Sequence, residues 1–539
     1  MAIVKQLDKR SGITYAYESK SFWDKEKKQS RCTRTLIGRV DPSTGEILPT
    51  DQRNRRQPLP ADTGHRKGPA PSVRTRRLFC GATFLFDQIG RKTGVTADLK
   101  TCFPSDYRKI LSIAYYLILE DRNPLSRFGK WSALHRHPFG GDIPSQRSSE
   151  LFASITEEGK DLFFRLQGKR RTGEEFWAYD STSISSWSQQ LGQVRYGKNK
   201  DHDRLAQLNL LLVYGQESNL PFYYRKLAGN IPDVKTVKGL VRDLGVLGYA
   251  KVKLVMDRGF YSKGNIDELY ANHFRFLIAV SARLSVVKDA IRAHGKAMRT
   301  FDHYDEAHEV YCHTDLIGWE CTRERPYKGG SVTDDRRMYL HLYYSPEQAV
   351  EDEKAFTLRM LSLKAELESD RRVPEHEEAY RKYFTVTSTP VRGLRVEPRT
   401  DAMAEAKECY GFFAFLSNDI RDPLVALRTY RNRDVIEKAF GNVKDRLNCR
   451  RTLVSSEASL EGKLFVEFVA LIYLSYIKKM MQDKGLFTKY TLQGLLDQLD
   501  VIEEFESPGK APYIGEILER QRQIYLDMEV DPPIGNSSL

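Results

Sequence analysis

The segment Lys251-Val-Lys-Leu-Val-Met-Asp-Arg-Gly-Phe-Tyr-Ser262 carries the strongest local signals for a fold class. Its first half is mostly apolar and predicts a short buried strand, and Ser262 is a suitable N-cap for a helix that follows. Asp257 therefore stands at the carboxyl end of the strand, where open α/β sheets bind their ligands, and Gly259 permits a tight turn there. The stretch predicts an α/β domain with a carboxylate on its functional rim.

Strands and helices alternate on both sides of this stretch. The patterns predict strands at 176–184, 208–214, 221–227, 251–256 and 274–280, and helices at 233–247 and 262–272. The order βββαβαβ is a meander followed by βαβ units, which makes the sheet mixed. Further on, strand-like pieces and a long charged helix at 346–369 interrupt this order, and a strand at 411–416 leads into a helix over 423–447.

Asp180 is the second carboxylate of interest. It lies in the first predicted strand, and Phe176 and Ala178 share its face because side chains repeat every second residue.

The third carboxylate, Glu437, lies within Tyr430-Arg-Asn-Arg-Asp-Val-Ile-Glu-Lys-Ala-Phe-Gly-Asn-Val-Lys444. At about 100° per residue, Tyr430, Arg433, Glu437 and Lys444 share one narrow stripe of the predicted helix. The apolar residues of the neighbouring sector, which are expected to pack on the sheet, are Ile436, Phe440, Val443 and Leu447.

Each of these features alone has an ordinary structural explanation. A lone aspartate is typical of a turn or a helix N-cap, and a mixed-charge helical face is typical of a solvated surface. Together, three carboxylates and an aligned cation pair favour an Mg²⁺ site that handles phosphodiesters, since Mg²⁺ prefers carboxylate, water and phosphate oxygens. Two such ions activate the attacking oxygen and neutralise the leaving one, while Arg433 and Lys444 hold phosphates.

The excess positive charge of the 539-residue chain lies at its N-terminal end. Lys and Arg number 85 against 72 Asp and Glu, which gives a net charge of +13. Residues 1–80 hold 18 basic and 8 acidic side chains and residues 81–150 hold 10 and 7, so the other 389 residues are balanced. This asymmetry predicts a front end that binds a polyanion, with a solubilising arm as the alternative. The arginines proposed for this contact are Arg53, Arg55, Arg56, Arg74, Arg76 and Arg77.

Composition also excludes several classes of protein. The longest apolar run, 464–477, contains Glu467 and is too short and too charged to span a membrane. The N-terminus has no apolar signal segment and the 7 cysteines form no C-x-x-C motif, so we expect a cytoplasmic protein without a disulfide scaffold or a zinc ribbon. The cysteines and histidines between 308 and 321 fit no zinc template.

The order of the three acids resembles that of the DDE transposases of bacterial insertion sequences, members of the ribonuclease-H-like, retroviral-integrase superfamily. The spacing Tyr430-x2-Arg433-x3-Glu437-x6-Lys444 is similar to the Tyr-Arg-Glu-Lys signature of the subgroup with a β-rich insertion before the glutamate. Tyr179-Asp-Ser-Thr-Ser-Ile184 also resembles the first acidic motif of that family.

The resemblance extends over about 175–480, and the second acidic motif, Met256–Tyr261, contributes to it. It implies a ribonuclease-H-like mixed-sheet α/β core interrupted by a β-rich insertion, with a basic β/helical N-terminal DNA-binding region and a helical C-terminal region. The regions expected are a basic arm with a short β piece and a linker (1–78), a helical DNA-binding region (79–170), the first part of the core (171–284), the insertion (285–408), the second part of the core (409–482) and a helical C-terminal region with a tail (483–539).

The resemblance also implies a mechanism. Asp180, Asp257 and Glu437 would bind two Mg²⁺ ions, with Mn²⁺ as a substitute, to hydrolyse the double-stranded DNA at the element's ends and transfer the 3′-hydroxyls into target DNA. Tyr430 would contact the phosphate near the cut, and a homodimer would hold two ends. Relatives that form a DNA hairpin stabilise a flipped base with an aromatic residue of the insertion, which makes Trp319 a candidate, although a packed tryptophan is the alternative.

Two other functions remain open. One is a ribonuclease-H-like nuclease or junction resolvase that cuts DNA without joining it. The other is a domesticated DNA-binding protein that has lost catalysis, which the complete set of acids and cations disfavours.

Overall fold

The structure is a computed structural model, which describes residues 2–534 except for 25–27, 51–75, 122, 171–174, 189, 202, 250–251, 325–329, 370, 390–392, 448, 450, 453 and 455. The chain forms two compact units, Met1–Arg74 and Thr75–Leu539. The described part of the first unit is an antiparallel sheet of β1 (Ala2–Leu7), β2 (Thr14–Asp24), β3 (Gln29–Val40) and β4 (Ile47–Pro49).

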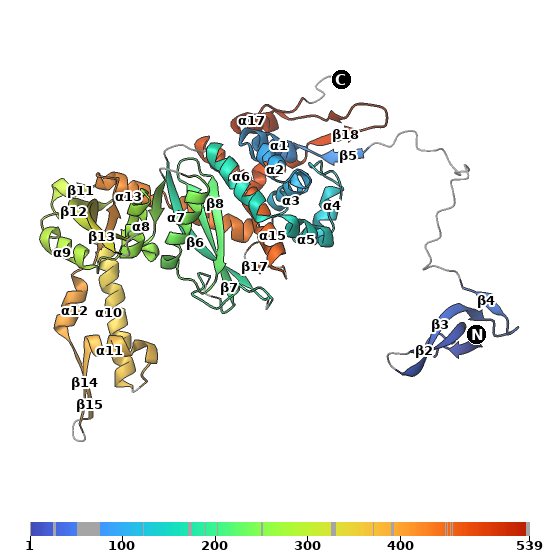
Figure 1. Cartoon of the computed structure of the whole chain (residues 1–539), viewed down its shortest axis with the longest axis horizontal. Coiled ribbons are helices and arrows are strands. Elements are labelled where there is room, and N and C mark those ends of the chain that lie inside the picture. The colour runs from blue at the N-terminus through green and yellow to red at the C-terminus, as the bar shows by residue number, and fades with distance from the viewer. Residues whose placement is uncertain are drawn as a thin grey trace. The chain divides into compact units, whose positions relative to one another are not determined.

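A large mixed sheet lies at the centre of the second unit (Figure 1), with strand order β11-β12-β13-β16-β10-β9-β6-β7-β8. β9 is parallel to β6 and to β10, while the other pairs along this path are antiparallel. The strands of the core are β6 (Phe176–Ser186), β7 (Gln207–Gly215), β8 (Pro221–Ala228), β9 (Lys253–Met256), β10 (Arg275–Val280) and β16 (Phe412–Ser417). The α/β fold class with a mixed sheet is therefore confirmed.

The order predicted around Asp257 is also confirmed. α7 (Val237–Val246) precedes β9, and α8 (Lys263–Ala271) follows it. Ser262 caps α8, since its hydroxyl accepts a hydrogen bond from the backbone N–H of Asn265 at 3.1 Å. The helix predicted at 233–247 begins with a separate 3₁₀ turn at Asp233–Lys235.

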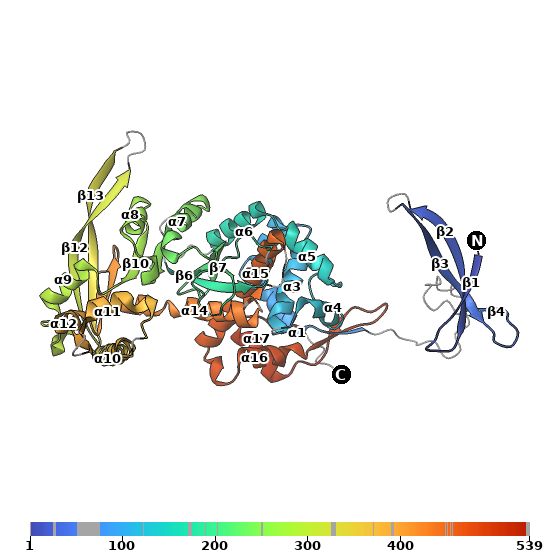
Figure 2. The same cartoon turned by 90° about the horizontal axis from the view of Figure 1, so that it is seen from below.

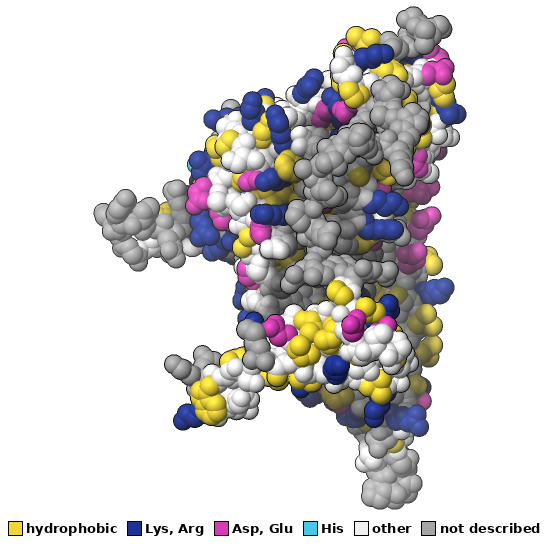
Figure 3. Space-filling view, turned by 90° about the vertical axis from the view of Figure 1, so that its right-hand side faces the viewer, with side chains coloured by type: hydrophobic (Ala, Val, Ile, Leu, Met, Phe, Trp, Pro, Cys, Tyr) yellow, Lys and Arg dark blue, Asp and Glu magenta, His cyan; other side chains and the backbone are white. Residues whose placement is uncertain are grey.

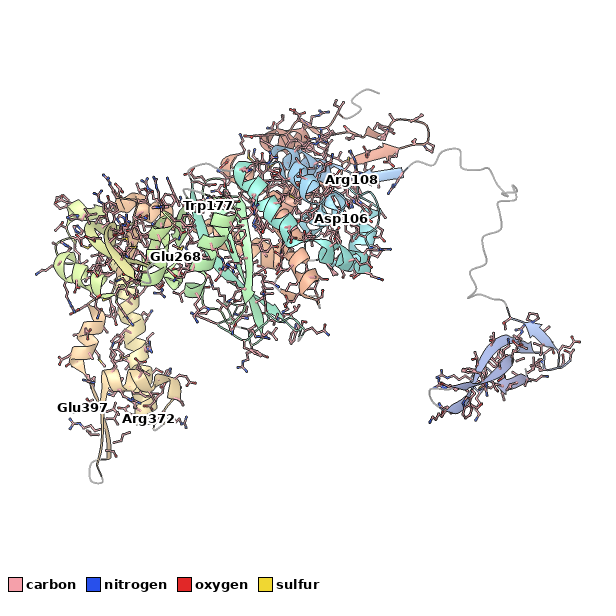
Figure 4. All side chains as sticks on the ribbon, viewed as in Figure 1. Asp106, Arg108, Trp177, Glu268, Arg372 and Glu397 are labelled. Atoms are coloured by element: carbon pink, nitrogen blue, oxygen red, sulfur yellow. The ribbon has the colours of Figure 1, made fainter. Side chains whose placement is uncertain are left out.

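The insertion extends the core sheet. Its long hairpin, β12 (Val310–Glu324) and β13 (Ser331–Tyr344), joins the sheet because β13 pairs with β16. Figure 2 shows this hairpin, and Figure 4 labels Arg372 and Glu397 in the lobe that projects from it. Its other elements are α9 (Ser285–His294), β11 (Tyr304–Asp305), α10 (Pro346–Glu368), α11 (Glu377–Tyr383), β14 (Phe384–Thr389), β15 (Gly393–Pro398) and α12 (Thr400–Lys407).

The N-terminal helices of the second unit pack around α15 (Glu457–Asp483), a helix buried on all sides along most of its length. The apolar run 464–477 thus belongs to the core of this unit. No helix among the described residues is long and apolar enough to cross a membrane. Helices that contact α15 include α1 (Gly81–Lys92), α3 (Tyr107–Leu119), α5 (Ser145–Ser154) and α6 (Glu157–Arg170). The other helices of this part of the unit are α2 (Val95–Cys102), α4 (Phe128–Ser132), α16 (Leu492–Asp500) and α17 (Glu519–Asp527).

The prediction of one helix over 423–447 is wrong, since the segment forms α13 (Pro423–Arg431), α14 (Asp434–Gly441) and one wide π-helical turn (Asn442–Arg446). Between α13 and α14, the backbone hydrogen bonds connect residues three apart instead of four. Asn432 lies at this break, and asparagine side chains compete with the helix for backbone hydrogen bonds. The apolar sector nevertheless packs as predicted: Ile436 and Phe440 are buried, and α14 contacts β6 and β7.

Candidate active site

The strand register places the first two carboxylates side by side. Tyr179 of β6 is paired with Met256 of the parallel strand β9. The residues that follow, Asp180 and Asp257, are therefore neighbours across strands that lie about 4.8 Å apart. Asp257 stands at the carboxyl end of β9, as predicted, and Asp180 lies within β6 beside it.

Tyr430 binds Asp257, the second of these carboxylates. Its hydroxyl donates a hydrogen bond of 2.9 Å to Oδ1 of Asp257. The ring stacks on Phe415 of β16 with 4.4 Å between the ring centroids, which fixes its direction. Burial and the charge of Asp257 raise the pKa of Tyr430, so its hydroxyl remains a donor at neutral pH.

Arg433 bridges the other two acids. Its Nη1 donates to Oδ2 of Asp180 at 2.8 Å, and its Nη2 donates to Oε1 of Glu437 at 2.9 Å. The side chains of Arg433 and Asp180 are each only 13% exposed, whereas that of Glu437 is 54% exposed. One guanidinium fork therefore connects a carboxylate of β6 to a carboxylate of α14.

Lys200 is a second cation at Asp180 and was missed in the sequence. Its Nζ lies 3.5 Å from Oδ1 of Asp180 and 3.4 Å from Oδ2 of Asp233, and it donates to the carbonyl of Ser181 at 2.7 Å. Burial raises the pKa of Asp180, while the charges of Lys200 and Arg433 act to lower it. The site thus balances its carboxylates with two side-chain cations.

The structure does not place Lys444 with these acids. Its side chain is 9% exposed, and its Nζ pairs with Oδ1 of Asp201 at 2.7 Å. Lys200 and Asp201 are adjacent in the sequence, so this dipeptide connects Asp180 to the turn that follows α14. The sequence did hold a signal for Lys200 and Asp201. The connection 187–206 between the antiparallel strands β6 and β7 exceeds about 12–15 residues, a length typical of functional loops.

The pair formed by Asp201 and Lys444 is expected to stabilise the protein and to position Glu437. Asp201→Asn should lower the free energy of unfolding by about 1–3 kcal/mol, because it removes one partner of a largely buried charged hydrogen bond. The double variant with Lys444→Gln should be little worse than either single variant, as thermal unfolding can measure. Arg204→Gln, an exposed charge in the same loop, serves as control. Additive losses in the double variant would show that the pair is not coupled.

The three acids have the chemistry of a magnesium site, since they supply hard carboxylate oxygens. In the part of the chain that the structure describes, His294, His313 and Asp315 form the group whose ligand atoms all lie within 4.8 Å of one another. The half-exposed Glu437 has to turn toward the two aspartates before all three can bind the same ions.

A cleft of about 970 Å³ opens beside Asp257 and Tyr430. Phe412, Phe413 and Phe415 contribute aromatic surface to its lining. Four exposed arginines, which give the cleft positive charge next to the acids, are Arg258, Arg283, Arg359 and Arg431.

The remaining candidates lie apart from this cluster. The indole of Trp319 donates to Oδ1 of Asp267 in α8 at 2.9 Å and packs at the edge of the core. Arg76 and Arg77 lie in β5 (Arg76–Phe79), where Arg77 pairs with Glu503 of β18 (Glu503–Glu506) at 2.7 Å. Arg53, Arg55, Arg56 and Arg74 fall outside the described residues.

Basic side chains are widely distributed on the surface. In Figure 3, Lys and Arg lie scattered among Asp and Glu over the face shown.

Comparison with known proteins gives one family. The family model described as "Transposase DDE domain" matches residues 171–473, more than half of the chain. A cryo-EM structure of the piggyBac transposase synaptic complex with hairpin DNA is similar at 10% identity, with a TM-score of 0.38, over 74% of this chain and 70% of that chain. No curated protein sequence matches the chain.

Proposed function

Because the chain belongs to the family of transposases with a DDE domain, we propose that it is the transposase of a bacterial insertion sequence. In this role it binds the terminal inverted repeats, cleaves the ends of the element and joins them to target DNA as a dimer. One observation carries the proposal: the tyrosine and the arginine of the Tyr-Arg-Glu-Lys spacing bind all three acids. Tyr430 donates to Asp257, Arg433 donates to Asp180 and Glu437, and the guanidinium of Arg433 lies over the Tyr430 ring at 5.4 Å.

Asp180, Asp257 and Glu437 would hold two Mg²⁺ ions, with Mn²⁺ as a substitute. The donor set fits, because its oxygens are hard ligands and the nearly buried Asp180 already attracts two side-chain cations. When bound, the ions supply electrostatic stabilisation of the charge on the reacting phosphodiester.

The chain's own residues hold the DNA in place for two displacements. In the first, a water oxygen loses a proton and bonds to phosphorus as the P–O3′ bond breaks, and the 3′ oxygen takes up a proton to become a hydroxyl. In the second, that hydroxyl oxygen loses its proton and bonds to a target phosphorus, and the displaced target oxygen leaves as a new 3′-hydroxyl. Arg433 would turn its fork from the carboxylates to a phosphate, and Tyr430 would contact the neighbouring one.

The arginine-lined cleft would accept a DNA strand at this site. Its four exposed arginines lie where phosphates must pass to reach Asp257, and its aromatic side chains offer surfaces on which bases stack. These four arginines would therefore make the DNA contacts near the acids, although residues 151–539 as a whole have no net charge.

The basic first unit is expected to contribute phosphate contacts of its own. Deleting residues 2–74, which leaves β5 in place, should flatten the dependence of DNA affinity on salt, because that slope scales with the number of phosphates neutralised. Fluorescence anisotropy with end DNA at several salt concentrations measures the slope. An unchanged slope would show that this unit does not touch DNA.

A joining assay tests the proposal against a nuclease that only cuts. The wild-type chain is incubated with Mg²⁺, a labelled fragment of the DNA that flanks its coding sequence, and a supercoiled plasmid. We expect the label to become covalently attached to the plasmid. Cleavage of the fragment without attachment would identify a nuclease, and neither product would identify a protein that only binds DNA.

A further inference from the structure

A second cluster of metal-ligating side chains lies in the insertion, away from the three acids. His294 is the last residue of α9, and His313 and Asp315 stand two residues apart on β12, hence on one face of the strand. Figures 1 and 2 both show α9 beside the hairpin that carries β12. The cluster therefore joins the beginning of the insertion to its long hairpin.

Both imidazoles point at the same carboxylate oxygen. Nε2 of His313 lies 2.9 Å and Nε2 of His294 lies 3.4 Å from Oδ1 of Asp315. The two rings are stacked, with 4.4 Å between their centroids. Ligand atoms around a tetrahedral zinc ion, about 2.0–2.1 Å from the metal, lie roughly 3.3 Å from one another. The spacing here is thus close to that of a zinc site.

The cluster is accessible and has room for a fourth ligand. The three side chains are between a quarter and two fifths exposed, at 39%, 26% and 26%. His313 also lines a pocket of about 350 Å³ together with His303, whose ring centroid lies 6.2 Å from that of His313. Water can complete the coordination.

We propose that His294, His313 and Asp315 bind a Zn²⁺ ion. Two imidazole nitrogens select a first-row transition metal over Mg²⁺, which prefers oxygen ligands throughout. Zn²⁺ binds the Nε2 atom of an imidazole that carries no proton on that nitrogen. The ion fastens α9 to β12 and is separate from the ions of the catalytic acids.

Zinc titration of the full chain tests the proposal. In Mg²⁺-free buffer, with a chromophoric chelator as competitor, His294→Ala and His313→Ala should each weaken one Zn²⁺ site by more than the roughly 10–100-fold that loss of an outer-shell partner costs. Asp180→Asn should retain this site, which separates it from the catalytic acids. Zn²⁺ should also raise the melting temperature of the wild type but not of His313→Ala.

The matched control is His376→Ala. This histidine of the insertion also pairs with a carboxylate, that of Glu366 at 2.8 Å, and should leave Zn²⁺ affinity unchanged. If an alanine variant does not fold, Asp315→Asn keeps the shape of the site and should show the same loss. Equal Zn²⁺ affinity in the wild type, His313→Ala and Asp315→Asn would overturn the proposal, as would the absence of Zn²⁺ binding to the wild type.

Discussion

Asp180→Asn is expected to reduce Mg²⁺-dependent cleavage of end DNA by at least about a thousandfold, because it removes one of the three proposed metal ligands, on which both proposed displacements depend. Affinity for the same DNA should stay within about twofold, since the phosphates are held by cations that the change leaves in place. Cleavage is measured on labelled fragments, and binding is measured by anisotropy in Ca²⁺.

This variant is also expected to fold. Burial raises the pKa of Asp180, and Lys200 and Arg433 do not fully offset it. A carboxyl group can have a higher pKa in the folded than in the unfolded protein. Folding then becomes less favourable as the pH rises from the unfolded-state pKa to the folded-state pKa. Above that interval, at neutral pH, a neutral Asn removes this unfavourable contribution. Arg433 keeps its ion pair with Glu437 and Lys200 keeps its ion pair with Asp233, so neither cation is left without a partner. Thermal unfolding of the variant should therefore remain cooperative.

Glu437→Gln should behave like Asp180→Asn, and α14 offers a matched control. Asp434→Asn changes an exposed carboxylate in the same helix that pairs with Lys438. It should retain cleavage at the wild-type rate. Cleavage that persists in Asp180→Asn or Glu437→Gln would contradict the assignment of the catalytic acids.

Arg433→Gln is the second change with a large expected effect. We expect cleavage to fall by about 10²–10³, the usual consequence of removing one group that stabilises transition-state charge. Stability should also fall, because Asp180 loses its closest cation. Breaking a buried pair from one side costs about 3–5 kcal/mol, and less here because Lys200 remains. Arg428→Gln, an exposed arginine of α13, is the control.

The same variant gives a test by pH. The charge of Arg433 lowers the pKa of Asp180, so its removal should raise that pKa further. The proposed role of Asp180 requires the ionised carboxylate. The acidic limb of the kcat/KM profile, which reports the free enzyme, should therefore move to higher pH in Arg433→Gln. Arg433→Lys keeps the charge but not the fork, and should move the limb back without restoring the full rate. An unmoved limb in Arg433→Gln would contradict the contact.

The α/β core was predictable because its signals are local. The apolar strand before Asp257 and the cap at Ser262 together specify strand, turn and helix, and the parallel pairing of β6 with β9 then brings Asp180 beside Asp257. Tyr430, Arg433 and Glu437 were recognisable by spacing, although the helix that carries them is broken. Tyr430 and Arg433 are three apart, so they remain on one side of the chain across the i→i+3 turn.

The interactions that depend on distant parts of the chain were not predictable. We predicted Lys444 on the same helix face as Glu437. The π-helical turn changes its direction, and it forms a buried ion pair with Asp201 of a loop distant in sequence. The spacing of cysteines and histidines gave no zinc template, because His294 precedes the hairpin and meets His313 only through the packing of α9. Such contacts depend on tertiary packing, which cannot be predicted from the periodicity of the sequence.

The assignment of the three acids as the catalytic centre can be tested by a structure of the full chain with end DNA and Mn²⁺, in which anomalous scattering locates the ions. We expect Mn²⁺ ions held by Asp180, Asp257 and Glu437, with Arg433 turned from the carboxylates to a phosphate of the DNA. No Mn²⁺ at these three acids, or Arg433 still bridging Asp180 and Glu437 while DNA occupies the cleft, would contradict this assignment.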